Sequence, residues 1–372
     1  MKFNKKNILF IVSIAISVFC SWLFARKIEW SLLKNAMKEA NYWFVIPSVI
    51  LALSIYAIRA LRWQGLLSHI KKIPVLNLIS ITSIGFMANH VLPARVGEAL
   101  RPFILYKKEN VKFSTSIATV IVERIFDMLG LIIFTVVVIT LLPHPTAYQH
   151  DPSVQVTAGE VTTFKESIIP SLKKWTAVFG GVGVFTIASM FLIIIKPAFF
   201  KKVLSSICFF LPHKLKDKIL GFYESFVHGL GILENKMQTV YMLALSIIIW
   251  IIGGAEIYLL GFSFHLQLPF VGACLVAICL ALAVAMPQAP GYIGVFHIAV
   301  LKSLDIFGVQ TTAAQSYAIV LWAISIIPST IMGFIFLWHE GITFHEVVKL
   351  EKEIAEGTLE EMEGITKDTP DK

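Results

Sequence analysis

Charged residues are scarce in this sequence. Only 15% of its 372 residues are Asp, Glu, Lys or Arg, whereas soluble proteins contain about 25%. Hydrophobic residues make up 56% of the chain, and the mean hydropathy is +0.76. This composition excludes a soluble enzyme fold, a disordered chain and a disulfide scaffold. It predicts a polytopic membrane protein, which leaves a transporter, a channel, a membrane-embedded enzyme or a membrane scaffold.

Cysteine motifs and nucleotide-binding motifs are also absent. The four cysteines form no CxxC pair and have no histidine or cysteine at metal-ligand spacing. We interpret them as small hydrophobic residues. The sequence has no phosphate-binding loop and no nucleic-acid-binding motif. It therefore predicts no metal, no cofactor and no nucleic-acid partner.

The formal charge of +8 is unevenly distributed. Residues 339–372 carry ten acids and four bases, so the preceding part of the chain is strongly basic. Basic membrane proteins keep Lys and Arg on the cytoplasmic side, next to anionic lipid. We divide the chain into a transmembrane domain over residues 1–338 and an acidic cytoplasmic tail over residues 339–372. The helical spacing of Val347, Leu350 and Ile354 predicts that the tail begins as a solvated helix.

The apolar segments predict an all-α polytopic integral membrane protein with about six full spans. A span needs about 20 residues. The expected spans lie near residues 8–25, 42–62, 114–142, 175–195, 239–264 and 313–338. The first is interpreted as a retained span because no small-x-small cleavage site follows it.

Two further segments, near 75–113 and 268–311, contain prolines and glycines and do not fit single spans. If the first segment enters from the cytoplasm and returns to it, the cytoplasmic side holds 18 bases, against seven plus Lys302 outside. A full crossing would reverse the usual preference for basic cytoplasmic loops. We therefore predict two opposed re-entrant helical hairpins in the cytoplasmic (inner) membrane, the first on the inner face and the second on the outer face. Both chain termini are then cytoplasmic.

The two hairpins share a short sequence pattern. When the sequence is shifted by 197 residues, Pro93 aligns with Pro290 and Gly97 aligns with Gly294. A Ser-Thr pair after the first hairpin also aligns with a Thr-Thr pair after the second. Opposed hairpins with matching sequences predict an inverted repeat. Such repeats are typical of transporters whose broken helices meet at the binding site.

Arginine and glutamate are concentrated in the first hairpin, in the segment LPARVGEALRP. Arg95, Glu98 and Arg101 recur at i, i+3 and i+6, which predicts Glu98 between two arginines on one helix face. One interpretation is a set of surface ion pairs in a cytoplasmic loop. The other is an anion site suited to phosphate, because Pro93 and Gly97 mark a helix start beside the arginines.

A second set of charges lies inside the span at 114–142. Glu123, Arg124 and Asp127 have apolar residues on both sides. A charge at the bilayer centre costs about 2.5–3.5 kcal/mol, so such residues usually face the protein interior and are functional. An internal ion pair or snorkelling towards the cytoplasm is the alternative. Glu256, alone in a later span, is interpreted as a proton carrier, as a partner of Arg124, or as an interfacial residue.

The second hairpin, MPQAPGYIGVFHIAV, is nearly uncharged. Pro290, Gly291 and Gly294 leave backbone groups free, and neighbouring elements must satisfy them. His297 by itself is interpreted as a packed histidine.

Two arginines and a tryptophan close the span at 42–62. Arg59, Arg62 and Trp63 have the composition of an interfacial anchor, in which basic and aromatic side chains meet the lipid headgroups. We predict that role for them.

Three segments resemble the lysylphosphatidylglycerol synthase/flippase transmembrane family: NHVLPARVGEALRP, FSTSIATVIVERIFD and PGYIGVF. This family includes the membrane half of the multiple peptide resistance factor. The resemblance spans roughly residues 8–340 and implies a flippase-like lipid translocase. It assigns transport roles to Arg95, Gly97, Glu98, Glu123, Arg124, Asp127, Pro290, Gly291 and Gly294.

The sequence departs from the family pattern in two places. Tyr292 stands where the family usually has glycine, and His297 where an acid is expected. The soluble aminoacyl-transferase half is also missing after the last span. The resemblance therefore implies a stand-alone member that does not make lysylphosphatidylglycerol itself, and a separate lipid-modifying synthase as a partner.

These features predict a transporter rather than an enzyme. It would move a phosphate-bearing lipid, either a glycerolipid or an isoprenoid or glycolipid, between leaflets. Arg95, Arg101 and Arg124 would hold the headgroup. The movement would be driven by an ion gradient or would need no energy source. The sequence assigns no oligomeric state. One alternative is a membrane-embedded transferase acting on a polyprenyl-phosphate substrate. Another is a non-catalytic scaffold for a lipid-modifying enzyme.

Overall fold

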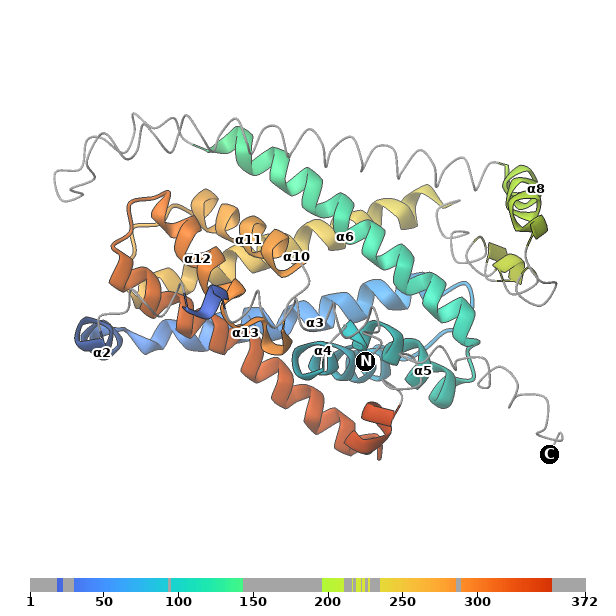
Figure 1. Cartoon of the computed structure of the whole chain (residues 1–372), viewed down its shortest axis with the longest axis horizontal. Helices are drawn as coiled ribbons and strands as arrows, with labels where there is room; N and C mark the ends of the chain where they lie inside the picture. Colours follow the sequence, from blue (N-terminus) through green and yellow to red (C-terminus); the bar gives the residue numbers. More distant parts are fainter. Residues whose placement is uncertain are drawn as a thin grey trace, which may run out of the picture.

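Every element in the described part of the chain is a helix (Figure 1). The computed structural model describes residues 19–22, 30–92, 95–142, 196–210, 235–285 and 289–349, with scattered positions between 216 and 227. The elements are α2 (Trp30–Glu39), η1 (Tyr42–Phe44), α3 (Val45–Leu67), α4 (Val75–Val91), α5 (Gly97–Glu109), α6 (Phe113–Leu141), α8 (Pro197–Ile207), η4 (Cys208–Phe210), α10 (Lys236–Ser263), α11 (Phe270–Ala285), η6 (Pro290–Tyr292), α12 (Val295–Asp305) and α13 (Thr311–His339). The all-α prediction is confirmed.

Among the described residues, four helical stretches are long and apolar enough to cross a membrane. They cover Tyr42–Leu67, α6, α10 and α13, and each has a hydropathy of 2.1 or 2.2 over its most apolar window. At about 1.5 Å per residue, each exceeds the roughly 30 Å of a hydrocarbon core. These four match predicted spans, so the protein is a multi-pass membrane protein. The predicted spans at 8–25, apart from 19–22, and at 175–195 lie outside the described residues.

The two interrupted segments each form a pair of short helices. α4 packs against α5, and α11 packs against α12. With 17 and 16 residues, α4 and α11 are shorter than the four long helices. Positions 93–94 and 286–288, at the two breaks, lie outside the described residues. The helical hairpins are thus observed, while their re-entrant position in a membrane stays a prediction.

Two sets of four helices follow each other in the same order with nearly the same spacing. α4, α5 and α6 begin at residues 75, 97 and 113, and α11, α12 and α13 begin at 270, 295 and 311. α3 and α10, which begin at residues 45 and 236, are the first helices of the two sets and run in opposite directions in Figure 1. The packing is also reciprocal, because α4 contacts α13 and α11 contacts α6. The repeat seen in the sequence therefore extends over four helices.

The two breaks also share an unusual backbone conformation. Arg95 and Tyr292 both have positive φ, at 54° and 59°, and they are 197 residues apart. For a residue other than glycine, this left-handed conformation costs roughly 1–2 kcal/mol of free energy. The same unusual conformation at both breaks supports the correspondence between the hairpins.

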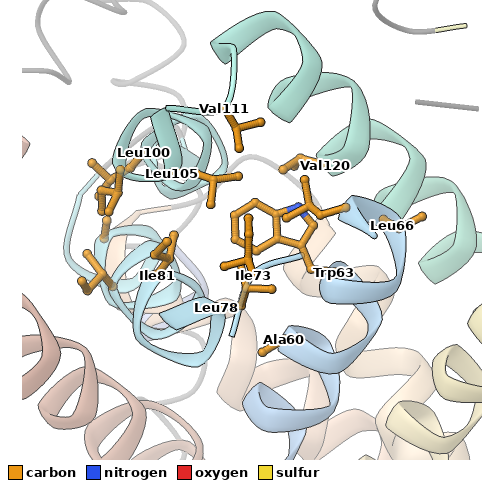
Figure 2. Packing of buried hydrophobic residues seen from close by; sticks show 14 of the residues in the cluster. Ala60, Trp63, Leu66, Ile73, Leu78, Ile81, Leu100, Leu105, Val111 and Val120 are labelled. Carbon is orange, nitrogen blue, oxygen red and sulfur yellow. The ribbon is translucent and has the colours of Figure 1, made fainter. Parts of the chain in front are cut away.

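The largest apolar core among the described residues surrounds Trp63, which is fully buried. Figure 2 shows its indole between α3, α6 and the first hairpin, close to Ile73, Leu105 and Val120. The Trp63 Nε1 donates a 3.0 Å hydrogen bond to Thr119. On the outside, the long helices expose apolar side chains that suit lipid contact, such as Ile46, Ile50, Val136, Val137, Ile248, Ile251, Ile331 and Ile335.

The beginning of the acidic tail packs on the first hairpin. Val347 is 1% exposed in the core around Trp63. Glu340 accepts 2.7 Å hydrogen bonds from Ser80 of α4 and Lys108 of α5. The prediction of a solvated helix is wrong at Val347, because this residue covers apolar surface of α5. Residues 350–372 lie outside the described residues, and the division at residue 338 stays a prediction.

Glu109 at the end of α5 gives a pH-dependent prediction. The pKa of its carboxyl lies below the usual range because Lys71 and Asn77 donate hydrogen bonds of 2.8 and 3.0 Å to it. A lowered folded-state pKa stabilises the fold above the unfolded pKa, and this contribution is lost as the pH falls through the folded value. The melting temperature difference between wild type and Glu109→Gln is therefore expected to be largest at neutral pH and to close below about pH 4. An equal gap at pH 7 and pH 3 would contradict this account.

Candidate functional site

The charged residues of α6 lie where this helix packs against α3, α5 and α10. Glu123 and Asp127 are one helical turn apart and share a face. Glu123 is fully buried and Asp127 is 8% exposed. Each acid needs cations or hydrogen-bond donors from the neighbouring helices, because an unpaired buried charge is costly.

Arg62 of α3 joins the two acids. Its guanidinium donates to Asp127 and, at 3.1 Å, to Glu123. It also donates a 2.7 Å hydrogen bond to Ser246 of α10. The Arg62 side chain has no exposed surface, so it is an internal ion-pair residue that ties α3, α6 and α10 together.

Arg101 of α5 reaches the same acid from the first hairpin. Its Nη2 donates a 2.8 Å hydrogen bond to Glu123. Its guanidinium carbon lies 4.2 Å from the centre of the Trp63 ring, within the range of a cation–π contact. Arg101 is 2% exposed, so the hairpin is anchored to α6 by a buried charge pair.

The outer side of these ion pairs is more open. Arg124 lies 3.1 Å from Glu123 and 3.3 Å from Asp127, but its side chain is 32% exposed. Glu98 lies 4.0 Å from Arg124 and is 34% exposed. Arg59 pairs with Asp127 at 3.0 Å. The arrangement therefore has a buried inner side and an accessible outer side.

We call these residues the charge cluster: Arg59, Arg62, Arg101, Arg124, Glu98, Glu123 and Asp127. Four arginines face three acids, so the cluster has one excess positive charge. Its arginines also have more donors than the cluster has acceptors. Within the described chain, the Nε atoms of Arg62, Arg101 and Arg124 lack a hydrogen-bond partner. The cluster is suited to an anion, and the described residues include no group of three acids, histidines or cysteines placed to hold a metal ion.

Arg95 lies outside this cluster. α5 begins at Gly97, so Arg95 precedes the helix, and its guanidinium donates to the carbonyl of Val284 in α11. The prediction of Glu98 between two arginines on one face is therefore wrong. Glu98 pairs with Arg124 of α6, while Arg101 points to the buried Glu123.

Gly97 allows the close approach of α4 and α5. A Cβ atom here would lie 1.8 Å from the carbonyl oxygen of Gly85. The Gly97 N–H donates a 2.9 Å hydrogen bond to the side chain of Asn89. This glycine therefore fixes the geometry of the first hairpin, next to Glu98.

The tip of the second hairpin meets the first. Gly291 and Gly294 have φ values of 72° and 85° around the turn that starts at Pro290, and Trp322 of α13 donates a 2.7 Å hydrogen bond to the Gly291 carbonyl. The Tyr292 ring packs edge-on against His90 of α4 at 5.7 Å. Together with the bond from Arg95, this contact joins the two broken segments.

The sequence profile of the lysylphosphatidylglycerol synthase TM region matches residues 10–333 of the chain. The protein belongs to this family. The predicted family resemblance is thereby confirmed.

Relatives of the lysylphosphatidylglycerol synthase TM family occur in archaea. A UPF0104 membrane protein of Methanocaldococcus jannaschii is 24% identical over 346 residues, which cover 90% of this chain and 95% of that protein. A UPF0104 membrane protein of Pyrococcus horikoshii is 24% identical over 88% of this chain and 95% of its own length. The glycosyltransferase AglD of Haloferax volcanii is 22% identical over 85% of this chain, but over only 52% of that protein. No solved structure matches significantly.

The two sequence blocks that resemble the family meet in space. Glu98 of the first block lies beside Arg124 of the second, at the open side of the charge cluster. The late block supplies Pro290, Gly291 and Gly294 at the other hairpin tip, where Tyr292 packs against His90 of α4. These separated blocks of the family member thus line one region of the molecule.

Glu256 of α10 forms a separate polar site. It is 6% exposed and accepts a 2.8 Å hydrogen bond from Ser325 of α13. The predicted pairing of Glu256 with Arg124 is wrong, because Arg124 binds the acids of the charge cluster. The burial of Glu256 also argues against an interfacial residue. Arg59 stands 197 residues before Glu256. The first repeat therefore carries the cationic cluster, whereas the second carries one acid, Glu256, among its described buried side chains.

Arg59, Arg62 and Trp63 were missed as site residues. The prediction of an interfacial anchor is wrong, because Arg62 and Trp63 are fully buried and both arginines bind Asp127. One signal could have identified them. The buried acids of α6 require partners, and Arg59 and Arg62 are cations one helical turn apart at the end of an apolar segment.

Proposed function

We propose that this protein moves a phosphate-bearing lipid between the leaflets of the cytoplasmic membrane. The observation that carries the proposal is the excess positive charge of the charge cluster, with its accessible side at Arg124. Arginine guanidinium groups bind phosphate oxygens through strong, charge-assisted hydrogen bonds. Family membership supports a lipid-related role, and the paired hairpins resemble the broken helices of transporters with inverted repeats.

The proposal assigns different roles to the inner and outer parts of the cluster. Arg62 and Arg101 hold Glu123 in place and are too buried to meet a headgroup directly. Arg124 and Arg59 present the accessible cations, and Arg95 contributes a further one at the hairpin break. The two hairpins, touching at their tips, would open alternately to opposite leaflets. Glu256 would carry a coupling proton, and a separate synthase would supply the modified lipid.

The test is lipid movement in reconstituted vesicles. Arg124→Ala is expected to reduce the rate for an anionic phospholipid about tenfold or more, because a hydrogen bond to a charged group contributes about 1.5–3 kcal/mol. Lys302→Ala is the matched control, since it removes an exposed cation of the other hairpin that pairs with the exposed Asp305. Equal rates in wild type and Arg124→Ala would contradict the proposed mechanism.

A second candidate is a transferase acting on a polyprenyl-phosphate lipid. It is supported by the name of one relative, the glycosyltransferase AglD, of which the match covers about half. The cationic cluster would then hold the lipid phosphate during transfer. Sugar transfer by the purified protein with an added divalent metal would favour this candidate, and unchanged lipid and sugar donor would count against it.

A further inference from the structure

We propose that Glu98 is a built-in competitor of the substrate phosphate. Its carboxylate occupies the exposed side of Arg124 when the site is empty and leaves when a phosphate group binds there. This inference rests on the proposed function of the charge cluster as a headgroup site. It names the group that the phosphate displaces.

The contact between Glu98 and Arg124 is the longest ion pair of the cluster. Its oxygen and nitrogen are 4.0 Å apart, beyond hydrogen-bond distance. The same guanidinium is held at 3.1 Å by Glu123 and at 3.3 Å by Asp127. Both Glu98 and Arg124 are about one-third exposed, so an incoming anion reaches this pair before any other.

The charge balance favours the exchange. With Glu98 in place, the cluster has one excess positive charge, and without it the excess is two. A phosphate monoester carries about −1.5 to −2 at neutral pH. Displacement of Glu98 therefore gives the bound phosphate a nearly matching cationic environment, whereas phosphate and Glu98 together would repel each other.

The position of Glu98 links this exchange to the first hairpin. Glu98 lies in the first turn of α5, directly after Gly97, and its contact with Arg124 ties the start of α5 to α6. The buried pair between Arg101 and Glu123 holds α5 further along. Release of Glu98 therefore loosens only the tip of the hairpin, where Arg95 contacts α11.

The test measures binding of phosphatidic acid to the full chain in nanodiscs of neutral lipid. Glu98→Gln is expected to lower the Kd about two- to fivefold, the range that corresponds to an exposed ion pair. Glu109→Gln is the matched control, because it removes the same charge from the other end of α5, where Glu109 pairs with Lys71. An equal or higher Kd for Glu98→Gln than for Glu109→Gln would overturn the proposal.

A double variant separates this inference from the proposed function. Arg124→Gln is expected to weaken the binding of phosphatidic acid. Adding Glu98→Gln to this variant should then bring no gain in affinity. A gain that persists without Arg124 overturns the competitor role. If Arg124→Gln alone leaves binding unchanged, the headgroup site itself is refuted.

Inorganic phosphate distinguishes the two sources of the ligand. If Glu98→Gln also binds inorganic phosphate more tightly than wild type, phosphate alone displaces Glu98. If Glu98→Gln binds only phosphatidic acid more tightly, displacement needs a phosphate carried on a lipid. Both results support the exchange. If the variant binds neither ligand more tightly than wild type, the proposal is overturned.

Discussion

Replacing Arg62 with methionine is expected to lower the free energy of unfolding by about 3–5 kcal/mol. Methionine keeps the length and apolar packing of the side chain, but it removes the cation that joins Glu123, Asp127 and Ser246. Both acids stay buried and lose a strong donor. Equilibrium unfolding in detergent micelles measures the loss.

Arg59→Met is the control for this prediction. Arg59 is also a cation of α3 that binds Asp127, but among the described residues it pairs with this one acid, and its side chain is 13% exposed. A loss of about 1.5 kcal/mol is expected, the value of one charge-assisted hydrogen bond. A larger loss for Arg59→Met than for Arg62→Met would show that Arg62 is not the central cation of the cluster.

Gly97→Ala is expected to destabilise the protein by about 3 kcal/mol, at the upper end of the range for overpacking. The added methyl group would meet the backbone carbonyl of Gly85, which cannot move away by a side-chain rotation. α4 and α5 must therefore separate, and the hydrogen bond from Gly97 to Asn89 is strained. Lipid movement should fall as well, because Glu98 and Arg101 follow on the displaced helix.

Gly253→Ala provides the comparison. In the part of the chain that the structure describes, no atom outside this helix's own backbone lies within 4 Å of a Cβ built on this glycine of α10. Alanine is therefore expected to leave the protein unchanged or to stabilise it by about 0.5–1 kcal/mol. If Gly97→Ala and Gly253→Ala unfold at the same denaturant concentration, the close approach of α4 and α5 is not needed for stability.

The long helices could be predicted because hydropathy is a local property. A run of apolar residues defines α6 or α13 whatever packs around it. The repeat was visible in a few prolines and glycines, since these residues mark the breaks. Its full extent needed the structure, because the order and approximate spacing of the helices are kept in both halves while the side chains differ, as at Arg95 and Tyr292.

The partners within the charge cluster could be predicted only in part. Glu123 and Asp127 stand out because acids are rare within spans. Arg62 does not, because a basic residue at the end of an apolar run has the same local pattern whether it faces headgroups or protein. Only the packing of α5 and α6 on α3 decides between these environments. Glu98 and Arg101 likewise point to different partners because α5 lies against α6.

The central claim, translocation between two opposed hairpins, depends on the hairpins opening to different sides of the membrane. Single cysteines at Lys107 and Asp305, in a cysteine-free background, test it with a reagent that cannot cross the membrane. Both side chains are more than half exposed. The account predicts labelling from outside at position 305 and protection at position 107. Labelling of position 107 from outside would make the first hairpin a full crossing and would contradict the account.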